Sequence, residues 1–398
     1  MRPIYGDQSM TRAISADSHA VESPEVFTGL AERFGEEAPR VISTPGEGDS
    51  IVIPARKNSA VNVAQMCLAS LRLDLEVPVD RRHAHKPDAG NLTDPTVKAL
   101  YAGGYAVMRE GITQGASRGD DQDIDGIAAE FLYPGYFPMF NLRNVELLVA
   151  LQKNYNDWLH DHCADSAGRL FGLAVLPMQD PDAAMEELDR ILAMGFRGAC
   201  IPSTAPADHP YYDSIFDPLW AKAAEAELPL SMHVGCFSYV PKEKRDGRRR
   251  DPIAQYAGSA AMIQDTLIEF ICRGVCERHP TLQLVVAEYN AGWIAHWLDR
   301  VDQGWQREVG RKANGPAHLP VHEIWRRQFY ATIEDDQPAL MTRSILGEDR
   351  LMWGSDYPHT DSTWPCSEAV LTEMFADYPV GTREKITRGN VQRLYKLD

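Results

Sequence analysis

Five side chains that can bind a metal or move a proton follow short apolar runs of the sequence. They are Asp17, His19, His233, Glu288 and Asp356. An ionisable group at the end of a buried strand is costly to bury unless it is paired or bound to a metal. Asp356 alone would also suit a helix cap, and His233 alone would suit a satisfied core histidine. Their recurrence after strands instead indicates one shared site for metal binding or proton transfer.

Asp17 and His19 are separated by one residue at the end of the first apolar run. Side chains on a strand alternate between its two faces, so residues two apart lie on the same side. One strand can therefore offer two metal ligands. A turn with a helix cap is the alternative interpretation of the same residues.

The elements that must position these groups alternate along the chain. Strands are predicted within 13–19, 125–134, 170–176, 198–202, 228–233, 282–287, 329–333 and 351–354. Helices are predicted at 95–109, 141–166, 181–194, 216–226, 253–278, 292–305 and 336–345. Alternating strands and helices imply a parallel sheet with right-handed crossovers. Eight units favour a closed (β/α)8 TIM barrel, whose functional residues gather at the carboxyl ends of the strands.

Composition narrows the class of protein. The chain has 398 residues and a net charge of −17, which argues against nonspecific binding to nucleic acid. No apolar run approaches the roughly 20 residues of a membrane helix, and the N-terminus lacks the apolar stretch of a signal peptide. We expect a cytoplasmic protein, no membrane or nucleic-acid partner, and one domain over residues 1–398. Residues 30–91 break the alternation and are predicted to form an irregular insertion or flap after strand 1.

Several motifs together resemble a known family. They are Ile14–His19, Met232–Gly235, Trp353–His359, Gly292-Trp293 and Asn390–Tyr395. The chain resembles the amidohydrolase superfamily, in the amidohydrolase-related branch that includes aminocarboxymuconate-semialdehyde decarboxylase. The resemblance implies a metal-dependent (β/α)8 barrel.

The resemblance also implies a ligand set. Asp17, His19, His233 and Asp356 would hold a divalent metal, with Zn²⁺ expected and Mn²⁺ or Fe²⁺ as alternatives. Two positions depart from the family pattern: Asp17 replaces the usual His of strand 1, and Glu288 replaces the usual His of strand 6. Both changes favour oxygen-preferring ions. Glu288 could also bind a second metal.

Hydrolysis is the activity that we expect from this site. Metal-activated water would attack an amide, an ester or a carbon–carbon bond beside a ketone, with Asp356 and Glu288 as acid–base groups and His359 stabilising an oxyanion. Nonoxidative decarboxylation of an aromatic or unsaturated acid is the first alternative, and hydrolysis is preferred because Glu288 removes the nitrogen base. A dinuclear iron oxygenase and a noncatalytic subunit are further alternatives.

The substrate is expected to be a small anionic molecule, with an aromatic ring or a linkage to coenzyme A as two options. Phe237, Trp293 and Tyr357 could form an aromatic wall, and Arg118 could bind a carboxylate. Six basic residues between 237 and 252 could steer an anionic substrate. The family resemblance implies a homodimer.

Overall fold

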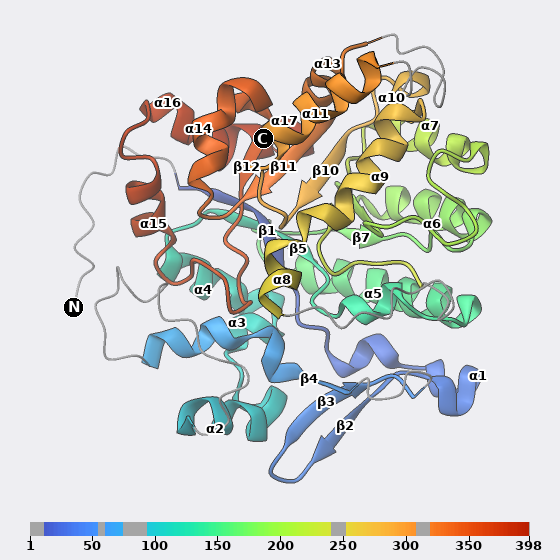
Figure 1. The fold of residues 1–398 in the computed structure, drawn as a ribbon. Helices are drawn as coiled ribbons and strands as arrows, with labels where there is room; N and C mark the ends of the chain where they lie inside the picture. Colours follow the sequence, from blue (N-terminus) through green and yellow to red (C-terminus); the bar gives the residue numbers. More distant parts are fainter. Residues whose placement is uncertain (1–11, 55–59, 75–93, 240–251, 308–318, 398) are drawn as a thin grey trace.

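Parallel strands surrounded by helices form a closed barrel (Figure 1). The computed structural model describes residues 12–54, 60–74, 94–239, 252–307 and 319–397. The barrel strands are β1 (Ile14–His19), β5 (Ala129–Tyr133), β6 (Leu170–Gly172), β7 (Ala174–Val175), β8 (Ala199–Ile201), β9 (Leu230–His233), β10 (Leu284–Ala287), β11 (Phe329–Ile333) and β12 (Leu351–Trp353). β6 and β7 are consecutive pieces of one strand interrupted at Leu173. The predicted (β/α)8 barrel is therefore confirmed.

The barrel closes where its first and last strands meet. The ladder runs β1-β5-β6 and then β7-β8-β9-β10-β11-β12, parallel throughout. At the seam, the Asp356 N–H donates to the carbonyl oxygen of Asp17 at 2.8 Å, and the Ser355 N–H donates to Ser15 Oγ at 2.8 Å. Residues more than 300 positions apart are thereby brought to one edge.

Helices cover the outside of the barrel. Their bounds are α1 (Leu30–Phe34), α2 (Pro95–Gly103), α3 (Glu110–Thr113), α4 (Arg118–Asp125), α5 (Val145–Ala164), α6 (Pro181–Met194), α7 (Asp217–Glu225), α8 (Pro252–Ala257), α9 (Ala260–Cys272), α10 (Val275–Arg278), α11 (Ile294–Gln306), α13 (Val321–Gln328), α14 (Gln337–Leu346), α15 (Ser367–Met374), α16 (Val380–Glu384) and α17 (Asn390–Tyr395). The single helix predicted at 253–278 is wrong. It is three helices, and Gly274 separates the last two with a left-handed φ of 85°. No helix among the described residues is long and apolar enough to cross a bilayer.

The segment after β1 contains more regular structure than its sequence suggested. Within the described parts of 30–91, β2 (Arg40–Thr44), β3 (Gly48–Val52) and β4 (Ala60–Asn62) form an antiparallel sheet beside the barrel (Figure 1). The rest of that predicted insertion, residues 55–59 and 75–91, lies outside the described residues. Ile51 of β3 and Val63, just after β4, are buried in an apolar cluster that also contains residues of β5 and α5.

Strand side chains divide the core into two layers. On β10, Leu284 and Val286 belong to the cluster between strands and helices, with Phe270 of α9. Val285 and Ala287 belong to the cluster inside the barrel, with Tyr330 of β11. This alternation is the period-two geometry of a strand buried on both faces. The filled interior gives the strand ends a rigid base.

Candidate metal centre

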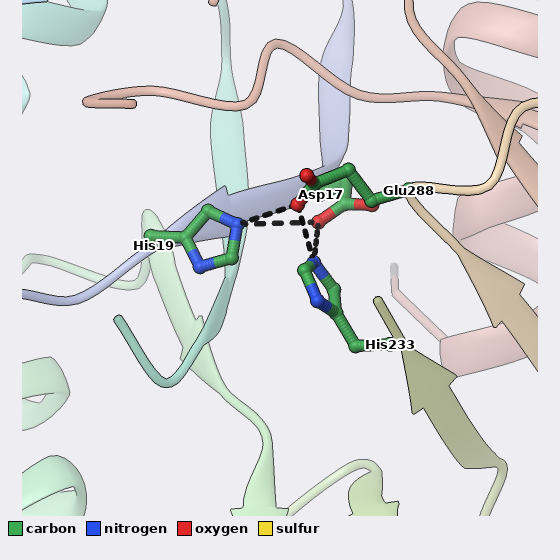
Figure 2. A group of neighbouring side chains, drawn as sticks. All are labelled: Asp17, His19, His233 and Glu288. Carbon is green, nitrogen blue, oxygen red and sulfur yellow. Dashed lines mark ion pairs between the residues drawn. The ribbon is translucent and has the colours of Figure 1, made fainter. Parts of the chain in front are cut away.

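β1 brings the first two side chains to the carboxyl end of the barrel. Asp17 and His19 lie on the same side of the strand, as the period of two predicts (Figure 2). The His19 N–H donates to the carbonyl oxygen of Tyr357 at 2.8 Å, which fixes the end of β1 against the loop after β12. Both side chains are almost completely buried.

β9 and β10 place His233 and Glu288 beside each other. His233 pairs with Ala287 in the sheet register, so Glu288 follows one step beyond. His233 Nε2 lies 2.9 Å from Glu288 Oε2 and 3.3 Å from Asp17 Oδ1 (Figure 2). Glu288 adopts a left-handed backbone, with φ 58°, which is unusual for a residue with a side chain. Strain of this kind is found where the surrounding structure holds a side chain in a functional position.

The loop after β12 supplies Asp356 and His359. Asp356 also has a left-handed backbone, with φ 58°, and its Oδ1 lies 3.1 Å from His19 Nε2. His359 Nδ1 lies 3.1 Å from the same oxygen, and its ring stacks on His19 with centroids 3.7 Å apart. His359 therefore contacts both Asp356 and His19.

Backbone carbonyls orient both buried imidazoles. His19 Nδ1 lies 3.1 Å from the carbonyl oxygen of Pro134, and His233 Nδ1 lies 2.7 Å from its neighbour Val234 O. A carbonyl oxygen only accepts hydrogen bonds, so Nδ1 carries the proton in each ring. In the neutral imidazole, Nε2 then presents its lone pair to the centre. This is the arrangement by which proteins orient metal-binding histidines.

Charge shapes the protonation of the centre. Burial lowers the pKa of His19, but its contacts with Asp356 and Glu288 outweigh burial and raise the pKa to about 9. Burial likewise opposes the charge of His233, whereas Glu288 and Asp17 raise its pKa. Burial raises the pKa of Glu288, but the charge of His233 and the contact with His19 lower it overall. The carboxylates therefore attract positive charge to this point.

A divalent cation fits this donor set. Ligand atoms of Asp17, His19, His233 and Glu288 lie within 4.8 Å of one another, and Asp356 and His359 join His19 and Glu288 in a second such group. No described group donates a hydrogen bond of good geometry to Asp17 Oδ1, Glu288 Oε2 or Asp356 Oδ1, although all three atoms are buried. A divalent ion would carry the same charge as the protons on two imidazoles and would satisfy these oxygens. Mixed oxygen and imidazole ligands suit Zn²⁺, Mn²⁺ and Fe²⁺.

A cavity of about 710 Å³ opens from this cluster. Asp17, Glu288 and Asp356 line one side of it. Apolar and aromatic side chains from the loop after β9, from α8 and α9, and from the loop between β10 and α11 also line it, namely Phe237, Tyr256, Met262, Tyr289 and Trp293. The structure thus brings the predicted Phe237 and Trp293 to the cavity. The six predicted basic residues, between 240 and 251, lie outside the described residues.

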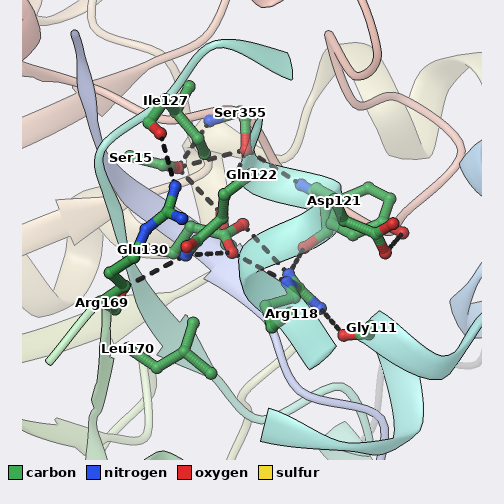
Figure 3. A network of polar contacts seen from close by, with 12 residues as sticks. Ser15, Gly111, Arg118, Asp121, Gln122, Ile127, Glu130, Arg169, Leu170 and Ser355 are labelled. Carbon is green, nitrogen blue, oxygen red and sulfur yellow. Dashed lines mark hydrogen bonds and ion pairs between the residues drawn. The ribbon is translucent and has the colours of Figure 1, made fainter. Parts of the chain in front are cut away.

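Arg118 (Figure 3) and Tyr357, also predicted to bind substrate, are instead buried in polar contacts within the chain. Arg118 Nε donates to Glu130 Oε2 at 2.8 Å, and its Nη2 donates to the carbonyl oxygen of Tyr357 at 3.1 Å. The Tyr357 hydroxyl donates to Asp121 Oδ2 at 2.7 Å. Neither residue is among the described residues that line the cavity. Spacing alone could not show that Arg118 has a buried carboxylate partner within the chain.

Sequence reasoning missed Thr332, which lines the cavity from β11. A hydroxyl inside the otherwise apolar run Tyr330–Ile333 was the available signal. It also missed Met262 and Tyr256, because the long helix predicted there concealed a break that turns these residues toward the cavity.

Comparison with known proteins adds sequence relatives. The gamma-resorcylate decarboxylase of Rhodococcus jostii (strain RHA1) is 28% identical over 273 residues, which cover 64% of this chain and 78% of that protein. The gamma-resorcylate decarboxylase of Rhizobium sp. (strain MTP-10005) is 26% identical over 271 residues, covering 63% and 77%.

Solved structures and a family model agree with the fold. The amidohydrolase map2389c of Mycobacterium avium subsp. paratuberculosis K-10 superposes with a TM-score of 0.73 at 21% identity, covering 97% of this chain and 98% of that one. The 5-carboxyvanillate decarboxylase LigW2 of Novosphingobium aromaticivorans, solved as its D314N mutant with bound manganese, gives a TM-score of 0.62 at 21% identity over 79% and 86% of the two chains. A model of the family described as Amidohydrolase matches residues 112–397, well over half of the sequence. This chain therefore belongs to the amidohydrolase family.

Proposed function

We propose that this protein is a metal-dependent, nonoxidative decarboxylase of an aromatic carboxylic acid. The observation that carries the proposal is that the carboxylates of the metal cluster line a cavity in which apolar and aromatic side chains outnumber the other polar ones, which include Glu334 and Asp361. Such a cavity suits a flat ring with a carboxylate directed at a cation. The sequence relatives named above are decarboxylases of this kind of acid and give the proposal its reaction.

These relatives contradict hydrolysis, the activity that was expected from the sequence. That expectation depended on Glu288 replacing a nitrogen base. Both relatives are named decarboxylases, and neither name describes a hydrolase. In the described structure, Glu288 lies against His19 and His233, where it can complete a ligand shell. Replacement of the strand 6 His therefore does not require a change of reaction.

The metal would be held by Asp17, His19, His233 and Asp356, the set that the family resemblance implies, and Glu288 belongs to both groups of neighbouring ligand atoms. When bound, a divalent ion would neutralise the substrate's negative oxygens and fix them in place. Phe237 and Trp293 would hold the ring by apolar contact. The Trp293 indole N–H donates to the carbonyl oxygens of Tyr289 and Asn290, at 3.0 and 3.1 Å, so its ring is held in a fixed position.

Decarboxylation breaks the bond between the ring carbon and the carboxylate, releases carbon dioxide and leaves the bonding electrons on the ring. A proton must then be added to that carbon. Glu288 and Asp356 line both the cluster and the cavity, and either carboxylate can take a proton from water and pass it to that carbon. His359, in contact with Asp356 Oδ1, would hold that carboxylate in position.

The identity of the metal is part of the proposal. We expect Mn²⁺ to support activity, because the shell offers three carboxylates and the 5-carboxyvanillate decarboxylase was solved with manganese. Zn²⁺, expected from the family resemblance, stays a prediction. Reconstitution of metal-free protein with each ion separates the two.

The test is product analysis in heavy water. Protein loaded with Mn²⁺ is given gamma-resorcylate, 5-carboxyvanillate and a panel of related hydroxybenzoates, and products are followed by NMR. The proposal predicts carbon dioxide and one deuterium on the carbon that carried the carboxylate, for at least one acid. Metal-loaded protein that releases no carbon dioxide from the panel, or that hydrolyses an ester or amide analogue while leaving the carboxylate intact, would contradict it.

A further inference from the structure

We infer that Thr332 is a positioning residue of the metal centre. Its hydroxyl is in contact with two potential ligand residues at once, Asp17 of β1 and Glu288 after β10. The inference depends on the metal centre of the proposed function but not on the reaction, because its test measures metal binding.

Thr332 joins β1 to the end of β10. Its Oγ1 donates to Asp17 Oδ2 at 2.7 Å and accepts the backbone N–H of Glu288 at 2.9 Å. Thr332 is itself 2% exposed, so water does not compete freely for these bonds. The hydroxyl therefore donates its proton to Asp17 and uses one of its lone pairs to accept the Glu288 N–H.

The first bond determines which oxygen of Asp17 faces the cation. With Oδ2 engaged by Thr332, Oδ1 is the oxygen that lies 3.3 Å from His233 Nε2. The backbone of Asp17 is fixed separately: a Cβ at Gly354 would lie 2.4 Å from Asp17 Cβ, so β12 approaches β1 closely there. This packing fixes the position of the Asp17 backbone, and the hydrogen bond from Thr332 fixes the direction of the Asp17 carboxylate.

The second bond helps to hold Glu288 in its strained conformation. A left-handed φ of 58° is strained for a residue with a side chain and persists only when neighbouring groups oppose relaxation. The N–H of Glu288 has its acceptor in the Thr332 hydroxyl. Loss of this acceptor would allow the peptide to turn and would move Glu288 Oε2 away from the two imidazoles.

Thr332→Val removes the hydroxyl and keeps the shape of the side chain, whereas Thr332→Ser keeps the hydroxyl. Thr266→Val is the matched control, because Thr266 is equally buried but donates to the carbonyl oxygen of Ser203, outside the metal cluster. Full-length proteins are equilibrated with buffered Mn²⁺, and the dissociation constant and the thermal midpoint of the metal-free form are both measured.

We expect Thr332→Val to weaken Mn²⁺ binding by about 10- to 100-fold, as for other outer-shell partners of metal ligands. Thr332→Ser should stay within about threefold of wild type, and Thr266→Val should lower the thermal midpoint without changing Mn²⁺ affinity. If Thr332→Val is insoluble, the difference between Thr332→Ser and Thr332→Ala isolates the hydroxyl. Equal Mn²⁺ affinity with and without the hydroxyl, equal weakening by Ser and Val, or no Mn²⁺ binding by wild type would each overturn the inference. Tight Mn²⁺ binding without decarboxylation would instead count against the proposed function alone.

Discussion

Two buried ionic clusters meet at the loop after β12, and they differ in how their charges are balanced. In the Arg118 cluster, Arg118 pairs with Glu130 (Figure 3), and Arg109 pairs with Asp121, with donors and acceptors at hydrogen-bond distance. At the metal centre, carboxylate and imidazole atoms instead converge on one point (Figure 2). The first cluster is complete within the chain, and the second has the charge and shape of a cation site.

The difference shows what a buried charged residue indicates. Arg118 is as deeply buried as His233, yet its guanidinium is used on a partner carboxylate and on backbone oxygens. Burial alone therefore does not identify a functional group. Convergence of several ligand atoms from different strands does.

The largest expected effect is on the free energy of unfolding and comes from a substitution in the Arg118 cluster. Arg118→Met leaves Glu130 buried without its cation, and we expect the free energy of unfolding to fall by about 3–5 kcal/mol. Urea denaturation of the metal-loaded protein measures it. Addition of Glu130→Leu removes the stranded charge and should restore much of the loss. A raised KM with unchanged stability would return Arg118 to the substrate-binding role predicted from the sequence.

A third buried carboxyl, Glu22, belongs neither to the Arg118 cluster nor to the ligand groups of the metal centre, although the charge of His19 acts on it. Burial raises its pKa from 4.5 to about 7, although the Tyr136 N–H donates to it. The folded state therefore keeps a proton that the unfolded chain releases, and this contribution to stability is present below pH 4.5 and lost as the pH rises through about 7.

Glu22→Gln cannot lose a proton. Its stability relative to wild type should rise between pH 4.5 and about 7, by on the order of 3 kcal/mol. Denaturation curves across this range measure the difference. A difference that does not change with pH would show that Glu22 is ionised in the folded protein.

The smallest expected effect is a difference in KM between variants of Phe237 and Tyr357. The sequence predicted that both aromatic residues would line the substrate site. Phe237 lines the cavity, whereas Tyr357 belongs to the Arg118 cluster. We expect Phe237→Ala to raise KM about tenfold, equivalent to about 1.4 kcal/mol of lost contact. Tyr357→Phe should leave KM unchanged and lower stability by about 1 kcal/mol. Steady-state kinetics with the active acid measure KM for both variants. A KM raised by Tyr357→Phe would show that Tyr357 also contacts substrate.

The barrel could be predicted because its strands are continuous apolar runs bounded by helices. β11 has the predicted bounds, and Asp17 and His19 share a face as the strand period requires. α4 was missed because its buried face carries Arg118, Asp121, Gln122 and Asp125, so the helix has no apolar periodicity to detect. A helix that buries charge gives no such signal in the sequence.

The site was predicted only as a set of strand ends. The sequence placed Glu288 after β10, but not its contact with two imidazoles or its left-handed backbone. These features depend on Thr332 and on the closure of the barrel, which join residues far apart in the chain. Which residues are partners, rather than which residues are charged, requires three-dimensional coordinates.

The metal content of protein purified without added metal tests most directly whether the metal centre, unlike the Arg118 cluster, needs a cation to balance its charges. Wild type is compared with His233→Ala and with His279→Ala, whose imidazole pairs with Asp217 away from the site. We predict about one equivalent of a divalent ion in wild type and in His279→Ala, and almost none in His233→Ala. Wild-type protein that holds no metal and takes up no Mn²⁺ or Zn²⁺ would contradict the account.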